Sequence, residues 1–384
     1  MDDFPASAAS PAPRRPTLSV VIPVFNGGAG FERCLQGVRS NLGVEFEVVV
    51  VDDGSTDGSA AVAERFGARV IRHETPRGPA AARNAGAEAA TAPIVFFLDA
   101  DVEPHADALS LALARFEADP DLAALFGSYD DQPAAPSLVS RYRNLLHHYV
   151  HQQGEFVEDA RPAHTFWTGC GAIRREVFLE IGGFDPSLYR RPAIEDIELG
   201  YRLGRAGHRI ILCRDVQGTH LKKWSLRSVI RTDIFCRGVP WMLLMLRSQT
   251  VETDLNVSRS QRSSVAATAM ALASLPLLAK SPVLGIVPLA SLLAVGWLNR
   301  DFYRFLAKTR SASFALAAFP LHLVYFVCCG TSVAIALGLR MLPKMVPSRQ
   351  PSTSHRSEPG SSPAPMSANA PIRARETSQW KDEP

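Results

Sequence analysis

The stretch Ile94-Val95-Phe96-Phe97-Leu98-Asp99-Ala100-Asp101 decides the fold class of this chain. Its five apolar residues predict a buried strand, and two carboxylates one residue apart follow at the carboxyl end of that strand. In open α/β sheets, ligands bind in the crevice outside the carboxyl ends of the strands. Because Mg²⁺-type sites combine one or two carboxylates with phosphate oxygens of a substrate, this stretch predicts a metal-bound diphosphate site. The alternative is an ordinary turn, in which Asp bonds its own backbone.

The chain around this stretch alternates strand-like and helix-like segments. Short runs rich in Val and Ile are ended by Pro, Asn, Asp or Gly and are followed by apolar residues at helical spacing. The strand-like runs are 18–22, 47–51, 69–72 and 94–98, and the helix-like segments include 34–38, 60–66 and 109–116. Such alternation predicts an α/β fold with a mostly parallel sheet.

The overall charge and the cysteines argue against several classes of protein. The 41 Lys and Arg residues nearly balance 38 Asp and Glu, and the formal net charge of +3 is too small to imply a nucleic-acid partner. The six cysteines are scattered without Cys-x-x-Cys or Cys/His spacing, so neither a disulfide framework nor a zinc site is predicted. Residues 1–16 are rich in Pro and Ala and lack the apolar core of a signal peptide. We therefore expect the domain that follows not to be exported.

The C-terminal third has the composition of a membrane region. Residues 264–279, 282–298 and 314–339 are apolar runs. As a helix the third run would extend over about 39 Å, enough to cross a hydrocarbon core of about 30 Å. The first two runs are shorter and are separated only by Lys280 and Ser281. They predict either a hairpin of two short spans or a re-entrant, interfacial pair.

Charged residues around the apolar runs predict their orientation. The loop before the third run is basic, with Arg300, Arg304, Lys308 and Arg310. Because cytoplasmic loops carry an excess of positive charge, this loop and the N-terminal domain are expected at the cytoplasmic face of the inner membrane, in a multi-pass protein. Basic residues also dominate 226–263, which either lies on an anionic membrane surface or presents a solvated helical face. The predicted segments are a disordered N-terminus (1–16), an α/β domain (17–225), an interfacial segment (226–263), a membrane region (264–339) and a disordered tail (340–384), whose side of the membrane stays open.

Five short clusters follow one another along the N-terminal part of the chain. They are Ser19-Val-Val-Ile-Pro-Val-Phe-Asn26, Val51-Asp-Asp-Gly-Ser-Thr-Asp57, Gly78-Pro-Ala-Ala-Ala-Arg-Asn84, Leu98-Asp-Ala-Asp101 and Glu195-Asp-Ile-Glu198. In this order, over about residues 17–225, they resemble glycosyltransferase family two, the inverting enzymes with the GT-A fold. The resemblance implies a Rossmann-like, mostly parallel sheet that binds a nucleotide sugar together with Mg²⁺ or Mn²⁺.

The first two clusters are expected to hold the nucleoside. The turn from Pro23 to Asn26 would offer backbone groups to a flat base. Asp52 and Asp53, beyond the second strand, would accept hydrogen bonds from a uracil N–H and a ribose hydroxyl, and the resemblance favours this contact for Asp53 especially. The alternative for the segment 52–55 is a turn with a helix N-cap, and both roles can hold at once.

The next two clusters and a late histidine are expected to hold the diphosphate and the metal ion. Arg83 supplies the fixed positive charge that a diphosphate leaving group requires; its alternative is a surface ion pair. The resemblance implies that Asp99 faces ribose or a metal-bound water, and that Asp101 ligates Mg²⁺ or Mn²⁺ directly. His220 follows a predicted strand, 210–213, where related enzymes often place a histidine near the metal or diphosphate. The alternative for His220 is a structural role.

Asp196 is the predicted catalytic base. An inverting transfer needs a base that removes the proton of the acceptor hydroxyl as its oxygen attacks the anomeric carbon. Glu195 and Glu198 are like charges that would raise the pKa of Asp196. Helical spacing puts these two glutamates on one face and Asp196 on another. The alternative is the ordinary enrichment of acids in the first turn of a helix.

The segment before the last cluster is the candidate for the sugar and acceptor side. Gly169, Cys170 and Gly171 would let a sugar approach the backbone closely. Trp167 would stack on a sugar face or else lie in the core, and Glu195 is assigned to the same side of the site. A predicted helix in the middle of the chain carries three histidines without an accompanying Glu, which favours a surface or interface helix over a metal site. They are His147, His148 and His151.

The predicted function is inverting transfer of a sugar from a nucleotide sugar, UDP-linked, to a hydroxyl of a lipid-linked glycan or glycolipid. The Gln-x-x-Arg-Trp signature of processive polysaccharide synthases is absent, and Lys222-Lys223-Trp224 stands in the comparable region, which favours one or a few additions. Membrane lipids are the other expected partner. The alternatives are a polyprenyl-phosphate glycosyltransferase and a non-catalytic membrane-bound module that binds nucleotide sugars.

Overall fold

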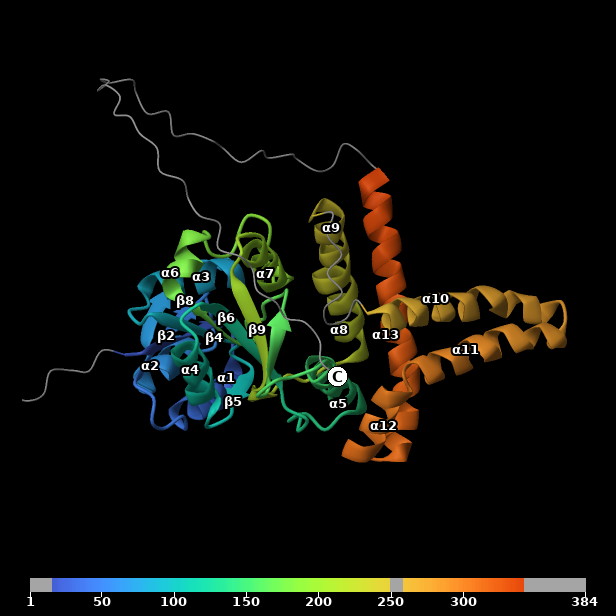
Figure 1. Cartoon of the computed structure of the whole chain (residues 1–384), viewed down its shortest axis with the longest axis horizontal. Helices are drawn as coiled ribbons and strands as arrows, with labels where there is room; N and C mark the ends of the chain where they lie inside the picture. Colours follow the sequence, from blue (N-terminus) through green and yellow to red (C-terminus); the bar gives the residue numbers. More distant parts are fainter. Residues whose placement is uncertain (1–15, 249–257, 342–384) are drawn as a thin grey trace, which may run out of the picture. The chain divides into compact units, whose positions relative to one another are not determined.

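A mixed sheet forms the centre of the N-terminal part of the protein. The computed structural model describes residues 16–248 and 258–341. Within these residues, nine strands form one sheet with the order β3-β2-β1-β4-β8-β6-β9-β5, and β7 pairs with β9 (Figure 1). The strands are β1 (Leu18–Val24), β2 (Phe46–Asp52), β3 (Arg69–Arg72), β4 (Ile94–Leu98), β5 (Val102–Pro104), β6 (Leu122–Tyr129), β7 (Ala160–Ala163), β8 (Cys170–Arg174) and β9 (Arg209–His220).

Strand direction changes in the middle of the sheet. β1 pairs in parallel with β2 and β4, and β2 pairs in parallel with β3. β8 runs antiparallel to both β4 and β6, whereas β6 pairs in parallel with β9, so the sheet is mixed rather than mostly parallel. Because the chain enters β8 at the edge where β4 ends, Cys170 pairs with Leu98. The segment before β8 therefore lies beside Asp99, whose backbone N–H donates to the Gly169 carbonyl at 3.4 Å.

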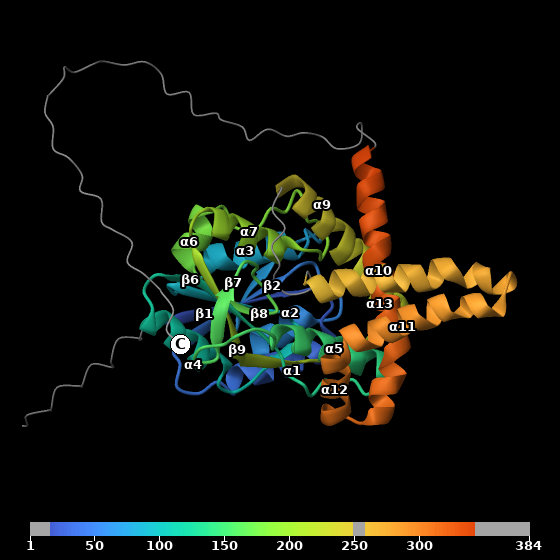
Figure 2. The same ribbon diagram turned by 45° about the vertical axis from the view of Figure 1, so that its right-hand side comes forward.

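Helices cover both faces of this sheet (Figure 2). β4 is buried on both sides, as its apolar run predicted: Phe96 packs in the core cluster that contains Phe31, and Phe97 packs in the opposite cluster against Phe178. α3 lies so close to β1 that a side chain on Gly86 would overlap Val21, so the glycine permits this packing. The helices of this part are α1 (Gly28–Arg39), α2 (Ser59–Arg65), α3 (Pro79–Ala89), α4 (Ala108–Ala118), α5 (Leu138–His151), α6 (Arg175–Glu180) and α7 (Glu195–Arg205).

The C-terminal part of the described chain is helical. Arg259–Ala279 and Ala312–Met341 are each long and apolar enough to cross a membrane. Pro282–Leu298 and Arg300–Thr309 pass the same test only together, and the two are bent by 63°. A broken span and a re-entrant pair both fit that bend. The elements are α8 (Leu226–Arg231), a π-helix η1 (Thr232–Gly238), α9 (Val239–Ser248), α10 (Arg259–Ser274), η3 (Leu275–Ala279), η4 (Pro282–Gly285), α11 (Ile286–Leu298), α12 (Arg300–Thr309) and α13 (Ala312–Met341).

The basic segment that was expected as a loop is largely the helix α12. Phe302 and Leu306 form its buried side, whereas Arg300, Arg304 and Lys308 are exposed at four-residue spacing. The sequence is amphipathic with a period of nearly four, which a loop does not require. This prediction was therefore wrong about the secondary structure of the segment.

α5 joins the sheet domain to the C-terminal helices. Tyr142 and Leu146 of α5 pack with Phe302 of α12 and Phe326 of α13 in one core cluster. α5 was expected as a surface or interface helix, and it lies between the sheet and the C-terminal helices. The predicted disordered segments 1–16 and 340–384 and the part 249–257 of the predicted interfacial segment lie almost wholly outside the described residues.

Candidate active site

A cavity of about 500 Å³ opens where β4 and β9 end and α7 begins. It brings together predicted site residues from distant parts of the sequence, from Arg83 to His220. The predicted site residues that line it are Arg83, Asp99, Asp101, Trp167, Glu195, Asp196 and His220. Its position at the carboxyl end of β4 agrees with the expectation from the opening stretch.

Arg83 connects three elements at the wall of this cavity. Its Nη2 donates to Asp99 Oδ1 at 2.7 Å, and its Nη1 donates to Glu195 Oε1 at 2.9 Å. The residue is only 5% exposed, so it is no surface ion pair. Burial by itself would lower the pKa of Arg83, but the charges of Asp99 and Glu195 outweigh it and raise that pKa. The Arg83 guanidinium group is thus held between the carboxyl end of β4 and the first residue of α7.

Asp101 and His220 face each other across the β5–β9 pair. Val102 pairs with His220 in that ladder, and His220 Nε2 lies 3.6 Å from Asp101 Oδ2. His220 Nδ1 lies 2.6 Å from Asn144 Oδ1, which can only accept, so Nδ1–H donates and Nε2 is left directed at Asp101. The His220 ring stacks on Tyr129 with centroids 4.2 Å apart. Such outer partners fix a metal-ligating imidazole in other proteins.

The donor set at this point suits a hard divalent cation. Burial opposes ionisation of Asp101, but its neighbours His220 and Lys222 lower the pKa of this carboxyl group overall. Within 16–248 and 258–341, no group of three or more His, Cys, Asp and Glu side chains is placed to hold a metal ion. A cation at Asp101 and His220 would therefore take its other ligands from water and from phosphate oxygens, which is the usual arrangement for Mg²⁺.

Asp196 lies in the first turn of α7. Its Oδ1 accepts from the backbone N–H of Ile197 at 2.8 Å, and its Oδ2 accepts from that of Thr168 at 3.3 Å. Burial, with a further contribution from the charge of Glu195, raises the pKa of Asp196 to about 7. Glu198 does not cause this shift, contrary to the sequence prediction, because it pairs with Arg202 at 2.8 Å. Glu195 and Glu198 thus have separate partners although they are three residues apart.

The segment before β8 places Trp167 in the wall of the cavity. Its ring packs against Tyr129 and His147, with centroid distances of 4.8 and 4.7 Å. A side chain on Gly169 would overlap the Trp167 ring, and one on Gly171 would overlap the Trp167 carbonyl. Among the described residues that line the cavity, neither glycine appears, nor does the buried Cys170, which pairs with the end of β4. The short residues of this segment thus make room for Trp167.

The nucleoside cluster forms a hydrogen-bonded scaffold at the ends of β1 and β2. Asp53 Oδ1 accepts from the backbone N–H of Arg77 at 2.9 Å and lies 2.7 Å from His73 Nδ1, while Oδ2 accepts from the N–H of Gly78 at 2.8 Å. Asp52 Oδ1 accepts from the N–H of Ser55 at 2.8 Å, as the turn alternative predicted. Both carboxylates are therefore buried and have protein partners, and Asp52 Oδ2 also lies 3.2 Å from Arg72 Nε.

The other half of that scaffold is the turn after β1. Asn26 has a positive φ of 52°, and its Oδ1 accepts from the N–H of Thr56 at 2.9 Å. Its own N–H donates to Ser55 Oγ at 2.9 Å. The turn that starts at Pro23 is thereby tied to the turn after β2. In the described chain, none of Pro23, Asn26, Asp52 and Asp53 lines the cavity.

Sequence reasoning missed a group of residues that line the cavity. His147 and His151 lie inside it, and burial followed by the charge of His151 holds the pKa of His147 well below its usual value. Arg237 and Trp241 come from beyond the predicted domain boundary at 225. The only signal for this last pair was the basic composition of the segment 226–263, which by itself does not indicate a cavity.

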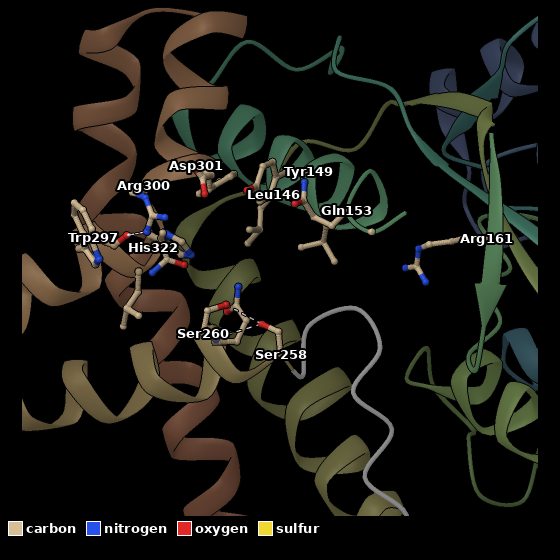
Figure 3. Close-up of a pocket in the computed structure, with 16 residues that line it drawn as sticks. Leu146, Tyr149, Gln153, Arg161, Ser258, Ser260, Trp297, Arg300, Asp301 and His322 are labelled. Carbon is tan, nitrogen blue, oxygen red and sulfur yellow. Dashed lines mark hydrogen bonds between the residues drawn. The ribbon is translucent and has the colours of Figure 1, made fainter. Parts of the chain in front are cut away.

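A larger cavity, of about 620 Å³, contains none of the motif residues (Figure 3). It lies among α5, the start of α10 and the helices α12 and α13. His322 lines it and hydrogen-bonds through Nδ1 to the hydroxyl of Tyr303 at 2.9 Å, so this polar residue of α13 faces α12. Size alone therefore does not select the candidate active site.

The family described as "Glycosyl transferase family 2" matches residues 19–182, which include four of the five sequence clusters. The chain carries a family 2 glycosyltransferase domain. The predicted family is confirmed by this match, and the predicted class, an α/β domain followed by apolar helices, is confirmed by the sheet and by the two membrane-length helices.

Two proteins named as glycosyltransferases are similar to the N-terminal part of this chain. Pre-mycofactocin glycosyltransferase of Mycobacterium tuberculosis is 32% identical over 226 residues, which are 56% of this chain and 46% of that protein. Validoxylamine A glucosyltransferase of Streptomyces hygroscopicus subsp. jinggangensis is 32% identical over 232 residues, which are 53% of this chain and 55% of that protein. The chain spans about half the length of both relatives.

A solved mannosyltransferase from Pyrobaculum calidifontis, in complex with GDP-Man and Mn²⁺, is 21% identical to this chain. The alignment covers 87% of this chain and 89% of that one, with a TM-score of 0.45. The family 2 match itself ends at residue 182, before Asp196 and His220. The far wall of the candidate site is thus made by parts of the chain outside the matched segment.

Proposed function

We propose that this protein is an inverting glycosyltransferase that moves a sugar from a UDP-sugar to a hydroxyl acceptor, with Mg²⁺ or Mn²⁺ as cofactor. One observation carries the proposal: the Asp101–His220 pair and Asp196, whose pKa is raised to about 7, line the same cavity. A metal-ligand pair and a separate base are the two functions that such a transfer needs.

The donor would bind on the β1 to β4 side of the site. Asp101 Oδ2 and His220 Nε2 would hold the cation, whose charge offsets the negative charge that develops on the leaving diphosphate. Arg83 would supply positive charge for the diphosphate and would orient Asp99 towards the ribose. Asp52, Asp53 and the turn from Pro23 to Asn26 would hold the nucleoside.

The acceptor would enter past Trp167 and α7. Asp196, when ionised, takes the proton of the attacking hydroxyl, and Glu195 holds Arg83 in place beside it. Trp167 offers an aromatic face to a sugar ring, with Gly169, Cys170 and Gly171 supporting its position. Attack from this side, opposite the diphosphate, inverts the anomeric centre.

The acceptor is proposed to be a lipid-linked glycan or glycolipid at the cytoplasmic face of the inner membrane. Support comes from the two helices that are apolar enough to cross a membrane, with a third bent pair, in the same chain as the site. A polyprenyl phosphate acceptor is the close alternative. The raised pKa of Asp196 favours a hydroxyl, because a phosphate oxygen is already ionised and needs no base.

A donor-release experiment tests the enzyme proposal against a binding module without turnover. Full-length protein in detergent, with membranes as acceptor source, is given UDP-, GDP- and dTDP-sugars. We expect release of nucleoside diphosphate that requires Mn²⁺ or Mg²⁺ and falls at least about 100-fold in Asp101→Ala and Asp196→Asn. Glu198→Gln is the matched control, since this carboxylate of the same helical turn faces Arg202. Nucleotide-sugar binding without release over any extract would contradict the proposal.

A further inference from the structure

We propose that the acceptor is an anionic glycolipid whose phosphate is bound by Arg237 and whose chain lies in an apolar cavity among α9, α10 and α13. This inference rests on the proposed function, because it names the acceptor of that site. It concerns a part of the chain outside the family 2 match.

The apolar cavity has a volume of about 410 Å³. Hydrophobic side chains form most of its wall, and the charged residues that line it are Arg143, Asp233, Arg237 and Arg262. The apolar and aromatic lining residues include Trp241, Met242, Met245, Leu246, Val265, Tyr325 and Val333. Methionine side chains are flexible and adapt to ligands of variable shape, and an aliphatic chain is such a ligand.

Two residues connect this cavity to the candidate active site. Arg237 and Trp241 line both cavities, whereas Met245 and Val265 line only the apolar one. Asp196 is also close enough to Arg237 to act on its charge. A molecule with a polar head, a phosphate and a chain would thus extend from the base, past Arg237, to the helices.

Among the described residues, Arg237 is the charged residue that lines both cavities. Arg143 donates to Asp233 at 2.6 Å and is neutralised by it. Within the described residues, Arg237 makes no hydrogen bond and has no carboxylate at ion-pair distance, although it is part-buried. Burial, followed by the charge of Arg143, lowers the pKa of Arg237, so its charge is unfavourable here without an anion. A phosphate would supply the missing partner.

The backbone holds Arg237 in a fixed place. It lies on the π-helix η1, a form that occurs often at functional sites. Asp233 ties one turn of η1 to α5, and a side chain on Gly238 would overlap Ser332, so η1 is packed tightly on α13. Arg237 therefore keeps its position relative to the wall of the apolar cavity.

The walls of the cavity favour a lipid over a free phosphate. Val265 belongs to Arg259–Ala279 and Val333 to Ala312–Met341, the two helices of membrane length. A chain in the bilayer would reach this cavity without passing through water. Inorganic phosphate, by contrast, would make no use of the apolar wall.

The test measures binding without donor or turnover, so it is independent of whether glycosyl transfer is detected. Full-length protein in a neutral detergent is titrated with dodecyl phosphate, and tryptophan fluorescence and calorimetry are recorded. Dodecanol and inorganic phosphate are the two probes that lack one half of the ligand. We expect dodecyl phosphate to bind at least about tenfold more tightly than either, because it uses both the cation and the apolar wall.

Variants locate the two halves of the binding site. Arg237→Gln should weaken dodecyl phosphate binding about tenfold or more and leave UDP affinity unchanged, while Arg247→Gln on α9 is the matched control with no loss. Met245→Trp should fill the cavity and weaken binding of dodecyl phosphate to a similar extent. Unchanged binding in Arg237→Gln or in Met245→Trp would overturn the proposal. So would a loss of UDP affinity in Arg237→Gln, because Arg237 would then serve the donor diphosphate.

Discussion

At the scale of single residues, the site contains two aspartates with opposite properties. His220 and Lys222 keep Asp101 ionised despite its burial, whereas burial and Glu195 raise the pKa of Asp196 to about 7. Environments that separate two carboxyl groups in this way commonly separate a charge-stabilising role from a proton-transfer role. Asp101 is therefore suited to bind a cation, and Asp196 is suited to accept a proton.

The pKa of Asp196 predicts the pH dependence of activity. A base must be unprotonated, so kcat/KM should fall about tenfold per pH unit below about pH 7 and level off above it. A pH profile of nucleoside diphosphate release checks this. Full activity down to pH 5 would show that another group is the base.

The same shift predicts how Asp196 affects stability. Its folded pKa lies above the unfolded value of about 3.9, so the unfolded chain loses this proton first and stability falls as pH rises from about 4 to about 7. Asn cannot ionise and avoids that loss. Asp196→Asn should therefore raise Tm relative to the wild type at pH 8 and change it little at pH 4. Equal differences in Tm at both pH values would contradict this explanation.

At the scale of elements, the antiparallel strand β8 and the first turn of α7 complete the candidate site at the carboxyl ends of the parallel strands. β8 brings Trp167 beside Asp99, and α7 brings Glu195 to Arg83. Arg83 of α3 thereby links β4 to α7 through a part-buried ion pair with Asp99 and a buried one with Glu195. Removal of one partner from a buried pair leaves an uncompensated charge.

Arg83→Gln should lower the free energy of unfolding by about 3–5 kcal/mol, because two carboxylates would lose their cation. Denaturant unfolding of the full-length protein in detergent measures this. Arg304→Gln is the control, since its pair with Asp301 is exposed and should contribute less than about 1 kcal/mol. Similar losses in both variants would show that the buried linkage has no special role.

At the scale of the whole molecule, the helical part completes both the core and the site. α5 shares a core cluster with α12 and α13, and α9 with η1 supplies Trp241 and Arg237 to the cavity. The described residues up to Met341 belong to one compact unit. The family 2 domain is therefore one part of a continuous structure.

A chain that ends at Ser248 should not remain a soluble folded monomer. Loss of α12 and α13 would expose Tyr142, Leu145 and Leu146 of α5, which pack on Phe302 and Phe326 in the full chain. Size-exclusion chromatography and thermal unfolding of the truncated chain test this. A monodisperse monomer with a cooperative transition would contradict it.

The sequence by itself determined the local features of this protein. Runs such as 94–98 and 314–339 are apolar enough to be assigned without a partner, because strand and helix periods are properties of neighbouring residues. The order of the five clusters was sufficient to predict the family, since each motif is contiguous.

Only the tertiary structure decided which side chains meet. The antiparallel direction of β8, the partners of Arg83, the approach of His220 to Asp101 and the entry of Arg237 into the cavity all join residues far apart in the chain. The pKa of Asp196 belongs to the same class, because its main cause is burial rather than its neighbours in the sequence. Distances across the fold and the exclusion of water are set by packing, which no local pattern of residues records.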